Sequence, residues 1–323
     1  MRAVLPDPAA SGPSRPAEVN GAAGRSDHLT RPGATTRAVG WESRAEQGHP
    51  ASLPDDAWLP AVERRLGPAR VVGRRRLTGG YVADAVERVD LDVDGAPVAV
   101  VLKTAGPVEI AAMRALAVVA GVEPRPLAVG PDWLVLPFVD GEPLADADPV
   151  PDQVWTTLAR VHEHWRGRRP RGIPVVDGPW WASLVDRTLV AVRGGLARTG
   201  APEFAGAERA LTAWRADPAI VGVLAVLPRT LCHGDTHRGN VLGSTLIDWG
   251  NARVAPAAID LATLRAQGAT PPSWYPQPSP VEAAWADVQV HVQYLGFAAD
   301  HLGPARVGEM TETASRALGD LRG

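Results

Sequence analysis

Several residue types are almost missing from this chain of 323 residues. It has a single cysteine, Cys232, so no disulfide can form within the chain, which is typical of a protein from a reducing compartment. It also has a single lysine, Lys103, among 33 basic residues. No apolar run reaches the length of a membrane span, and Pro6 and Pro8 interrupt the first candidate for a signal peptide. We therefore expect a cytoplasmic protein without a membrane partner.

The charge balance and the composition are those of an ordinary globular protein. The formal net charge is −3, which gives no reason to expect nucleic acid as a partner. Hydrophobic residues make up 45% of the chain, enough for a sizeable core. Residues 1–52 differ, because they are rich in Pro, Ala and Gly and poor in large apolar residues. Such a segment cannot offset the entropy of ordering it, so we predict that it is disordered.

Residues 53–139 have the pattern of a small β-rich unit. Asp94-Gly95 is a hairpin signal, and Gly130-Pro131 marks a second turn between short strands. The expected elements are helices at 56–66 and 107–119, strands at 82–91 and 97–103, and two short strands within 124–139.

Residues 140–323 have a mainly helical pattern. In 154–165 the apolar residues Val154, Leu158, Val161 and Trp165 recur at helical spacing. We predict an α+β fold with two lobes, a small β-rich N-terminal lobe (53–139) and a larger helical C-terminal lobe (140–323). The other elements expected in the second lobe are helices at 180–196, 205–214, 257–266, 281–302 and 306–321, a short strand before His233, and a hairpin at 240–249.

The segment most informative for function is Cys232-His233-Gly234-Asp235-Thr236-His237-Arg238-Gly239-Asn240, followed by Ile247-Asp248-Trp249-Gly250. Mg²⁺ prefers oxygen ligands and keeps several waters, so the amide of Asn240 and the carboxylate of Asp248 would suffice as ligands. Phosphoryl transfer needs a further carboxylate at the attacking hydroxyl, and Asp235 suits that role. His233-x-Asp235-x-His237 also permits a metal-dependent hydrolase, although no further His or Cys cluster offers the other ligands of a zinc site.

The order of these residues resembles the catalytic and metal-binding motifs of the aminoglycoside phosphotransferase family. The family pattern is His-Gly-Asp, then Asn five residues after the Asp, then a strand that ends in Asp. The resemblance covers about residues 70–300 and implies a protein-kinase-like fold. It also implies that Asp235 is the catalytic base and that Asn240 and Asp248 bind Mg²⁺. We expect His233 and Asp260 to brace the loops by hydrogen bonds.

The same resemblance assigns a lysine and a glutamate to ATP binding. In kinase-like folds a strand lysine holds the α- and β-phosphates of ATP, and a glutamate on the next helix positions it. Lys103 ends an apolar strand, and Glu109 is the sole acidic residue between Lys103 and Val122. We therefore expect Lys103 and Glu109 to form this pair.

Two further segments resemble nucleotide-binding parts of the family. Residues 134–141 resemble the hinge between the lobes, which implies that the Pro137 carbonyl and the Val139 N–H hold the adenine. Gly79 and Gly80 are expected to cover the phosphates, although Thr78-Gly79-Gly80-Tyr81 departs from the usual G-x-G-x-x-G pattern.

These residues predict an ATP- and Mg²⁺-dependent O-phosphotransferase that acts on a hydroxyl of a small molecule. The acceptor is expected to be an antibiotic, such as an aminoglycoside or a macrolide, or a metabolite alcohol. From residue 151 onward acidic residues are scattered, whereas a polycationic aminoglycoside favours an acidic pocket. The tryptophans of the helical lobe are expected to be mostly core residues, with one or two of Trp180, Trp181 and Trp274 lining the acceptor pocket. Two alternatives stay open: an inactive nucleotide-binding pseudokinase, and the metal-dependent hydrolase. We expect a monomer or weak dimer.

Overall fold

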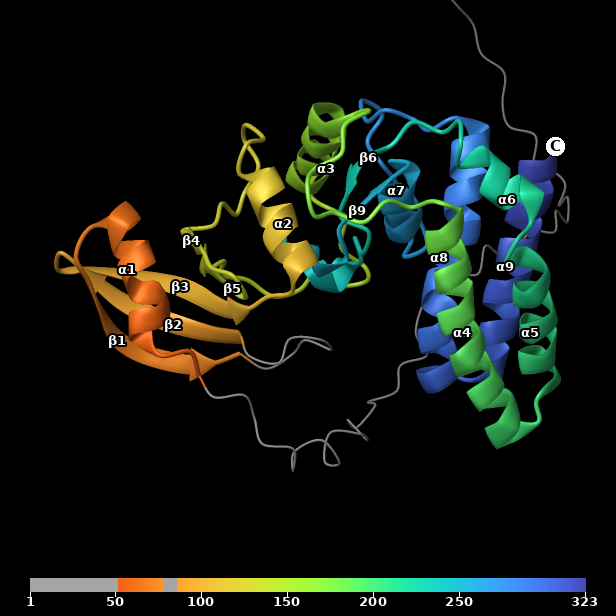
Figure 1. Cartoon of the computed structure of the whole chain (residues 1–323), viewed down its shortest axis with the longest axis horizontal. Coiled ribbons are helices and arrows are strands. Elements are labelled where there is room, and N and C mark those ends of the chain that lie inside the picture. The colour runs from red at the N-terminus through yellow and green to blue at the C-terminus, as the bar shows by residue number, and fades with distance from the viewer. Residues whose placement is uncertain (1–51, 78–85) are drawn as a thin grey trace, which may run out of the picture.

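Figure 1 shows the computed structural model of the chain, which describes residues 52–77 and 86–323. An antiparallel sheet lies at one end and a group of long helices at the other. The strand order in the sheet is β1-β2-β3-β5-β4. The elements of the first lobe are α1 (Asp55–Leu66), β1 (Ala69–Arg76), β2 (Val86–Val93), β3 (Ala96–Thr104), α2 (Pro107–Leu116), β4 (Ala128–Val129) and β5 (Trp133–Pro137).

The β2–β3 hairpin determines which way Lys103 points. Asp94 and Gly95 have φ of 50° and 84°, the left-handed values that a tight two-residue hairpin turn needs. Side chains alternate between the two faces of a strand, and Val100 and Leu102 of β3 are buried in the core under α1. Lys103 therefore points to the opposite face of the sheet, toward the second lobe.

Helix α2 packs away from the core under α1. Its apolar side chains Ile110, Met113 and Leu116 belong to a cluster that also contains Trp155 and Leu158 of α3. Helix α2, which follows Lys103, is thus packed on the C-terminal lobe and connects the sheet to that lobe.

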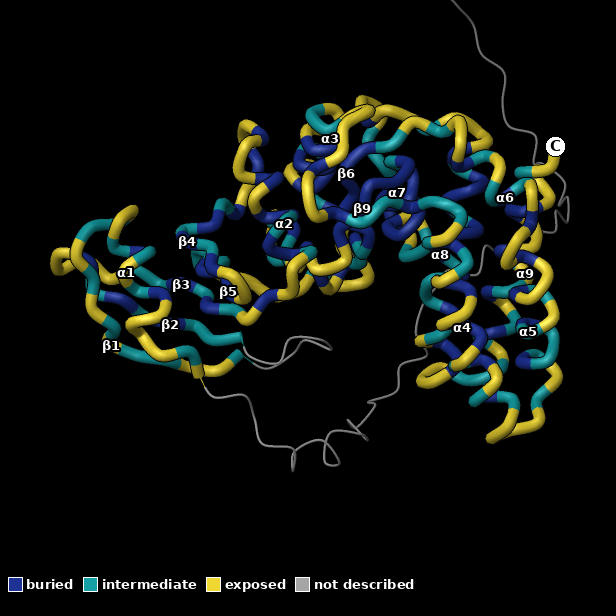
Figure 2. Tube along the Cα trace, viewed as in Figure 1, coloured by how far each residue is buried: buried dark blue, intermediate teal, exposed yellow. Residues whose placement is uncertain are grey.

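The C-terminal lobe is mostly helical, and α4, α5, α8 and α9 run side by side (Figure 1). Figure 2 shows that the faces these helices turn toward one another are buried. The elements of this lobe are α3 (Asp152–Trp165), α4 (Gly178–Thr199), α5 (Pro202–Trp214), α6 (Pro218–Val223), β6 (Thr230–Cys232), β7 (Val241–Leu242), β8 (Thr245–Leu246), β9 (Arg253–Ala255), α7 (Ala258–Arg265), α8 (Pro280–His301) and α9 (Pro304–Arg322).

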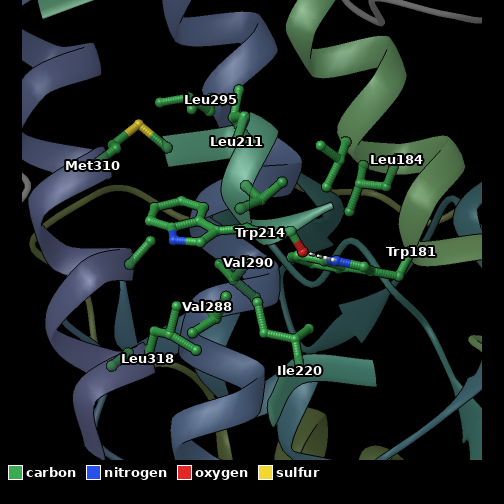
Figure 3. Close-up of a cluster of buried hydrophobic side chains, with 14 of the residues drawn as sticks. Trp181, Leu184, Leu211, Trp214, Ile220, Val288, Val290, Leu295, Met310 and Leu318 are labelled. Atoms are coloured by element: carbon green, nitrogen blue, oxygen red, sulfur yellow. Dashed lines mark hydrogen bonds between the residues drawn. The ribbon is translucent and has the colours of Figure 1, made fainter. Parts of the chain in front are cut away.

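Trp181 lies in the core of this lobe and does not line a pocket. Figure 3 shows Trp181 in a cluster of buried apolar side chains, and its Nε1 donates to the Trp214 carbonyl at 2.9 Å. The side chain is completely buried, so Trp181 is one of the expected core tryptophans and not one that lines the acceptor pocket. Trp274 is half exposed and Trp180 is partly buried.

Two short strands bring the motif loops together. β6 pairs antiparallel with β9, and Cys232 at the end of β6 is opposite Arg253 at the start of β9. The turn after β6 contains Asp235, and the segment before β9 contains Asp248. Both loops therefore leave the same end of this two-stranded sheet.

The α+β architecture with a β-rich lobe and a helical lobe is confirmed. Helices predicted at 56–66, 154–165 and 281–302 are present within two residues of their expected ends. The sequence analysis gave no bounds for β1, and it missed α6 and β9, which are short. The lobe boundaries at 52/53 and 139/140 stay predictions, and residues 1–51 and the expected Gly79-Gly80 turn lie outside the described residues. Within 52–77 and 86–323, no helix has the length and apolar character needed to cross a membrane.

Candidate active site

Lys103 joins two carboxylates from different parts of the chain. Its Nζ lies 2.8 Å from Oε1 of Glu109 in α2 and 2.9 Å from Oδ1 of Asp248. The side chains of Lys103 and Glu109 are 12% and 7% exposed, whereas that of Asp248 is 44% exposed. A largely buried ammonium thus sits between one buried carboxylate and one that is open to solvent.

The contacts in this group stabilise the charges of Lys103 and Asp248. Burial alone lowers the pKa of Lys103, but the carboxylates of Glu109 and Asp248 outweigh it and raise that pKa. Burial raises the pKa of Glu109, and Lys103 offsets only part of the increase. Burial also opposes ionisation of Asp248, yet Lys103 has the larger combined effect and lowers its pKa. Lys103 is therefore positively charged and Asp248 negatively charged at neutral pH.

The β7–β8 hairpin brings Asn240 next to Asp248. The backbone N–H of Ile247 donates to the Asn240 carbonyl at 2.8 Å, so Asp248 follows directly after the closing pair of the hairpin. Asn240 donates its Nδ2 to the Asp235 carbonyl at 2.9 Å, which leaves its amide oxygen as a ligand atom. Asp248 has φ of 61° and ψ of 68°, a strained conformation for a residue other than glycine. Trp249, beside it, is 1% exposed and anchors the turn in the core.

Asp235 is held through both of its carboxylate oxygens. Tyr294 of α8 donates its hydroxyl to Oδ1, and Asn251 donates Nδ2 to Oδ2 at 3.0 Å. Burial and then the Asp235 carboxylate raise the pKa of Tyr294 far above its ordinary value, so the phenol is the donor. His237 Nε2 lies 3.9 Å from Oδ2, beyond hydrogen-bond distance.

Asp260 braces the turn before Asp235, as expected from the sequence. Its carboxylate is completely buried and accepts the backbone N–H groups of His233 at 2.9 Å and Gly234 at 2.8 Å. The ring of His162 in α3 donates Nε2–H to the same carboxylate at 2.9 Å. Burial opposes ionisation of Asp260, but these donors, His162 first, lower its pKa.

His233 also has a bracing role, which is confirmed. Its Nε2–H donates to the Ile247 carbonyl at 2.8 Å, and its Nδ1 accepts the Asp235 N–H at 3.2 Å. Burial lowers the pKa of His233, so the ring is neutral at neutral pH. Since both ring nitrogens have partners, the geometry gives no support to His233 as a ligand of a hydrolytic metal.

A second group of metal-type ligands lies in the core. His162, Cys232 and Asp260 are buried, and their ligand atoms lie within 4.8 Å of one another. His162 is already hydrogen-bonded to Asp260, and burial raises the pKa of Cys232, so its thiol is protonated. Cys232 Sγ lies 3.5 Å from the Ala255 and Pro256 carbonyls. This group is a hydrogen-bonded brace, and Cys232 is a small core residue.

The turn before Asp235 has room only for glycine. Gly234 has φ of 80°, and a Cβ there would lie 2.3 Å from the Asn251 carbonyl oxygen and 2.4 Å from Nε of Arg253. Arg253 is buried and donates Nη2 to the Gly234 carbonyl and Nε to the Asn251 carbonyl, both at 3.0 Å. The two loops are thereby tied to each other through one guanidinium.

The predicted adenine-binding segment follows β5. Pro137 pairs with Val100 of β3, and the Phe138 N–H donates to the Ala99 carbonyl at 3.1 Å. Val139 is half-buried, and its backbone N–H has no hydrogen-bond acceptor among residues 52–77 and 86–323.

The structure therefore brings most of the predicted residues together. Lys103, Glu109 and Asp248 are in direct contact, and Asn240 is bonded to Asp235. Sequence analysis missed Tyr294, Asn251 and Arg253. Asn251 could have been suspected, because it is a polar residue three positions after Asp248, but nothing in the local sequence of Tyr294 marks it.

A family model described as the phosphotransferase enzyme family matches residues 74–293. The match covers more than half of the chain, which therefore belongs to this family of small-molecule phosphotransferases. The chain is also 29% identical over 212 residues to Protein StrN of Streptomyces griseus, with 59% of this chain and 66% of that protein covered. The alignment thus spans slightly less than two thirds of that relative.

Solved structures confirm the protein-kinase-like fold. A choline kinase from Cryptosporidium parvum has a TM-score of 0.51 and 12% identity, with 77% of this chain and 89% of that chain covered. A thermostable mutant of the aminoglycoside phosphotransferase APH(4)-Ia, in a ternary complex with ADP and hygromycin B, has a TM-score of 0.51 and 13% identity. That alignment covers 82% of this chain and 98% of the other.

Proposed function

We propose that this phosphotransferase is ATP- and Mg²⁺-dependent and transfers the γ-phosphoryl group to a hydroxyl of a small molecule. The observation that carries the proposal is the contact of Lys103 Nζ with both Glu109 and Asp248, at 2.8 Å and 2.9 Å. It joins the strand lysine of one lobe to the proposed metal loop of the other. Lys103 would bind the α- and β-phosphates, and Glu109 would hold the ammonium in place.

The donor set at Asn240 and Asp248 fits Mg²⁺. An amide oxygen and an ionised carboxylate are hard oxygen ligands, and the exposed carboxylate of Asp248 leaves room for water and phosphate oxygens. When bound, the ion would neutralise the charge on the phosphate oxygens during transfer. On the side of the phosphates, the neighbour of Asp248 would be the ammonium of Lys103.

Asp235 would bind the acceptor hydroxyl and accept its proton. Its carboxylate oxygens can each accept a further hydrogen bond beside those from Tyr294 and Asn251. The Asn240–Asp235 contact keeps the proposed base next to a proposed metal ligand. Catalysis would then depend on positioning and electrostatics, as in other phosphoryl transfers.

The nucleotide base would lie at the segment between the lobes. The Pro137 carbonyl and the Val139 N–H would hold the adenine, and the free N–H of Val139 within the described chain supports this assignment. Gly79 and Gly80 are proposed to lie over the phosphates. The ADP in the APH(4)-Ia complex is consistent with a nucleotide substrate.

The acceptor is proposed to be an antibiotic, such as an aminoglycoside or macrolide, or a metabolite alcohol. The APH(4)-Ia complex contains hygromycin B, and the second structure is a choline kinase, so the fold accommodates different alcohols. Within the described chain, the side chains that hydrogen-bond the Asp235 carboxylate are Tyr294 and Asn251, both neutral donors. The scattered acidic residues from residue 151 onward support an acceptor that is less cationic than an aminoglycoside.

The test is ATP consumption against a panel of hydroxyl-bearing antibiotics and metabolites. Wild type should phosphorylate at least one compound, with activity lost in EDTA and restored by Mg²⁺. Asp235→Ala should lose turnover and still bind ATP, and Asp300→Ala, an exposed carboxylate in α8, should behave as wild type. Wild type that binds ATP and phosphorylates nothing would favour the pseudokinase alternative. A cytoplasmic location and a monomeric or weakly dimeric state stay proposals.

A further inference from the structure

Two neutral donors hold the carboxylate of Asp235 from different sides. Tyr294 belongs to α8, 59 positions along the chain, and donates to Oδ1. Asn251, 16 positions along, follows the proposed metal loop and donates to Oδ2 at 3.0 Å. An aspartate side chain held at one oxygen can still rotate, whereas one held at both has a single orientation.

We propose that Tyr294 and Asn251 are the positioning residues of the transfer reaction, which fix the orientation of Asp235 toward the acceptor hydroxyl. The proposal rests on the proposed function, because it takes Asp235 as the group that binds the acceptor. A general base must lie within hydrogen-bond distance of the proton it accepts, and a small misplacement of a reacting group is costly.

Both donors are themselves held rigidly. Arg253 is buried and donates to the carbonyls of Asn251 and Gly234, both at 3.0 Å. It also donates Nη1 to Oε1 of Gln293, the neighbour of Tyr294, at 2.8 Å. Gln293 in turn donates Nε2 to the Gly234 carbonyl at 3.0 Å. One guanidinium therefore connects Asn251, the turn before Asp235, and the part of α8 that holds Tyr294.

The chemistry of the donors suits a base. Neither the phenol of Tyr294 nor the amide of Asn251 carries a charge, so they orient the carboxylate without forming an ion pair. Asp248, by contrast, is paired with the ammonium of Lys103. The two aspartates are thus held by different means, Asp248 by a cation and Asp235 by neutral hydrogen bonds.

Kinetics of Tyr294→Phe test the positioning role, because this substitution removes one oxygen and keeps the ring. We expect kcat to fall about 10- to 100-fold, as for loss of a hydrogen bond to a charged group, with the KM for ATP within about twofold of wild type. Asn251→Ala should likewise lower kcat and leave the KM for ATP nearly unchanged. The control is Thr188→Val, which removes a hydroxyl that bonds the Val292 carbonyl of α8 at 3.2 Å and does not contact Asp235. It should leave kcat unchanged.

The Asp235→Ala background separates positioning from a general structural effect. In that background Tyr294→Phe should cause no further loss of the residual turnover, because the group it positions is absent. Unfolding in urea tests the contact without any acceptor. Tyr294→Phe should lower the urea concentration at the midpoint of unfolding when it is made in wild type. It should not do so when it is made in Asp235→Ala, because the hydroxyl there has already lost its acceptor.

The possible results distinguish the two proposals. Wild type that turns over no acceptor refutes the proposed function and this inference with it. Wild type that turns over, with Tyr294→Phe within about twofold in kcat, overturns the positioning role alone. The positioning role is also overturned if Tyr294→Phe lowers the turnover of Asp235→Ala by the same factor as that of wild type. An equal change of the unfolding midpoint in both backgrounds has the same consequence.

Discussion

Lys103 Nζ lies 2.8 Å from Oε1 of Glu109. The two residues are six positions apart, one at the end of β3 and one in the first turn of α2. The contact is buried, and α2 is packed on the C-terminal lobe. The position of the ammonium therefore depends on both lobes, and the proposed nucleotide site is assembled only when they are joined.

Replacement of Lys103 should abolish efficient nucleotide use. Lys103→Met leaves Glu109 buried without its partner, and we expect kcat/KM for ATP to fall at least about 100-fold. Lys103→Arg should not restore activity, because the planar guanidinium cannot take the place of a compact ammonium between two carboxylates. Steady-state kinetics and ATP titration by calorimetry measure both effects. Arg114→Ala, on the exposed face of α2, should leave them unchanged, and recovery of activity in Lys103→Arg would contradict the argument.

Loss of a proposed metal ligand should appear as a higher requirement for Mg²⁺. Changes in residues that only support metal ligands cost about 10- to 100-fold in affinity, so Asp248→Asn and Asn240→Ala should raise the half-maximal Mg²⁺ concentration by at least about tenfold. Titration of activity with Mg²⁺ measures this. The control is Asp300→Asn, an exposed carboxylate near the end of α8. An unchanged Mg²⁺ dependence in both ligand variants would remove them from the metal site.

Asp260→Asn should lower stability in a pH-dependent way. The substitution weakens three hydrogen bonds to a buried carboxylate, and we expect a loss of about 2–4 kcal/mol at neutral pH. The pKa of Asp260 is lowered by folding. Its contribution is therefore complete above the unfolded pKa of about 3.9 and is lost as the pH falls through the folded value.

Urea unfolding at several pH values checks this prediction. The difference in free energy of unfolding between wild type and Asp260→Asn should be constant from neutral pH down to about pH 5 and shrink below about pH 4. Asp300→Asn, which is exposed, should show little difference at any pH. A gap that widens in acid would show that the carboxylate is not stabilised by folding.

Gly234→Ala should destabilise the site far more than a matched glycine substitution. The new Cβ would meet backbone and a buried guanidinium at 2.3–2.4 Å, in a left-handed conformation that costs about 1–3 kcal/mol by itself. Gly243→Ala in the β7–β8 turn also has positive φ, at 56°, but meets nothing within 4 Å. It should cost about 1 kcal/mol and retain activity. Equal effects of the two substitutions on the unfolding midpoint would argue against the close packing around Gly234.

Trp181→Ala should be among the most destabilising single changes in the helical lobe. Removal of a completely buried tryptophan leaves a large cavity and the Trp214 carbonyl without its donor, with an expected loss of about 3–5 kcal/mol. Trp274→Ala is the matched control, since that ring is half exposed. Chemical unfolding followed by circular dichroism compares them, and a loss below about 1 kcal/mol for Trp181→Ala would be inconsistent with the packing in Figure 3.

Local sequence predicted the elements that have strong local signals. Asp94-Gly95 and Gly130-Pro131 mark turns, and the long helices have regular apolar spacing, so their positions were predicted closely. The two-residue strands β7 and β8 were found only because they surround a turn. Strand β9 and helix α6 were missed, because three to six residues are too few to establish a period.

The sequence alone identified the residues that are proposed to form the site. The spacing from Asp235 to Asn240 and Asp248, and the single lysine at the end of an apolar strand, are properties of short segments, so they can be recognised without a fold. The tertiary structure decided which residues hold them. Tyr294 reaches Asp235 across 59 positions, and Asp260 reaches the His233 and Gly234 N–H groups across 27 and 26. Such contacts depend on how α7 and α8 pack against β6 and β9, and no local pattern specifies that packing.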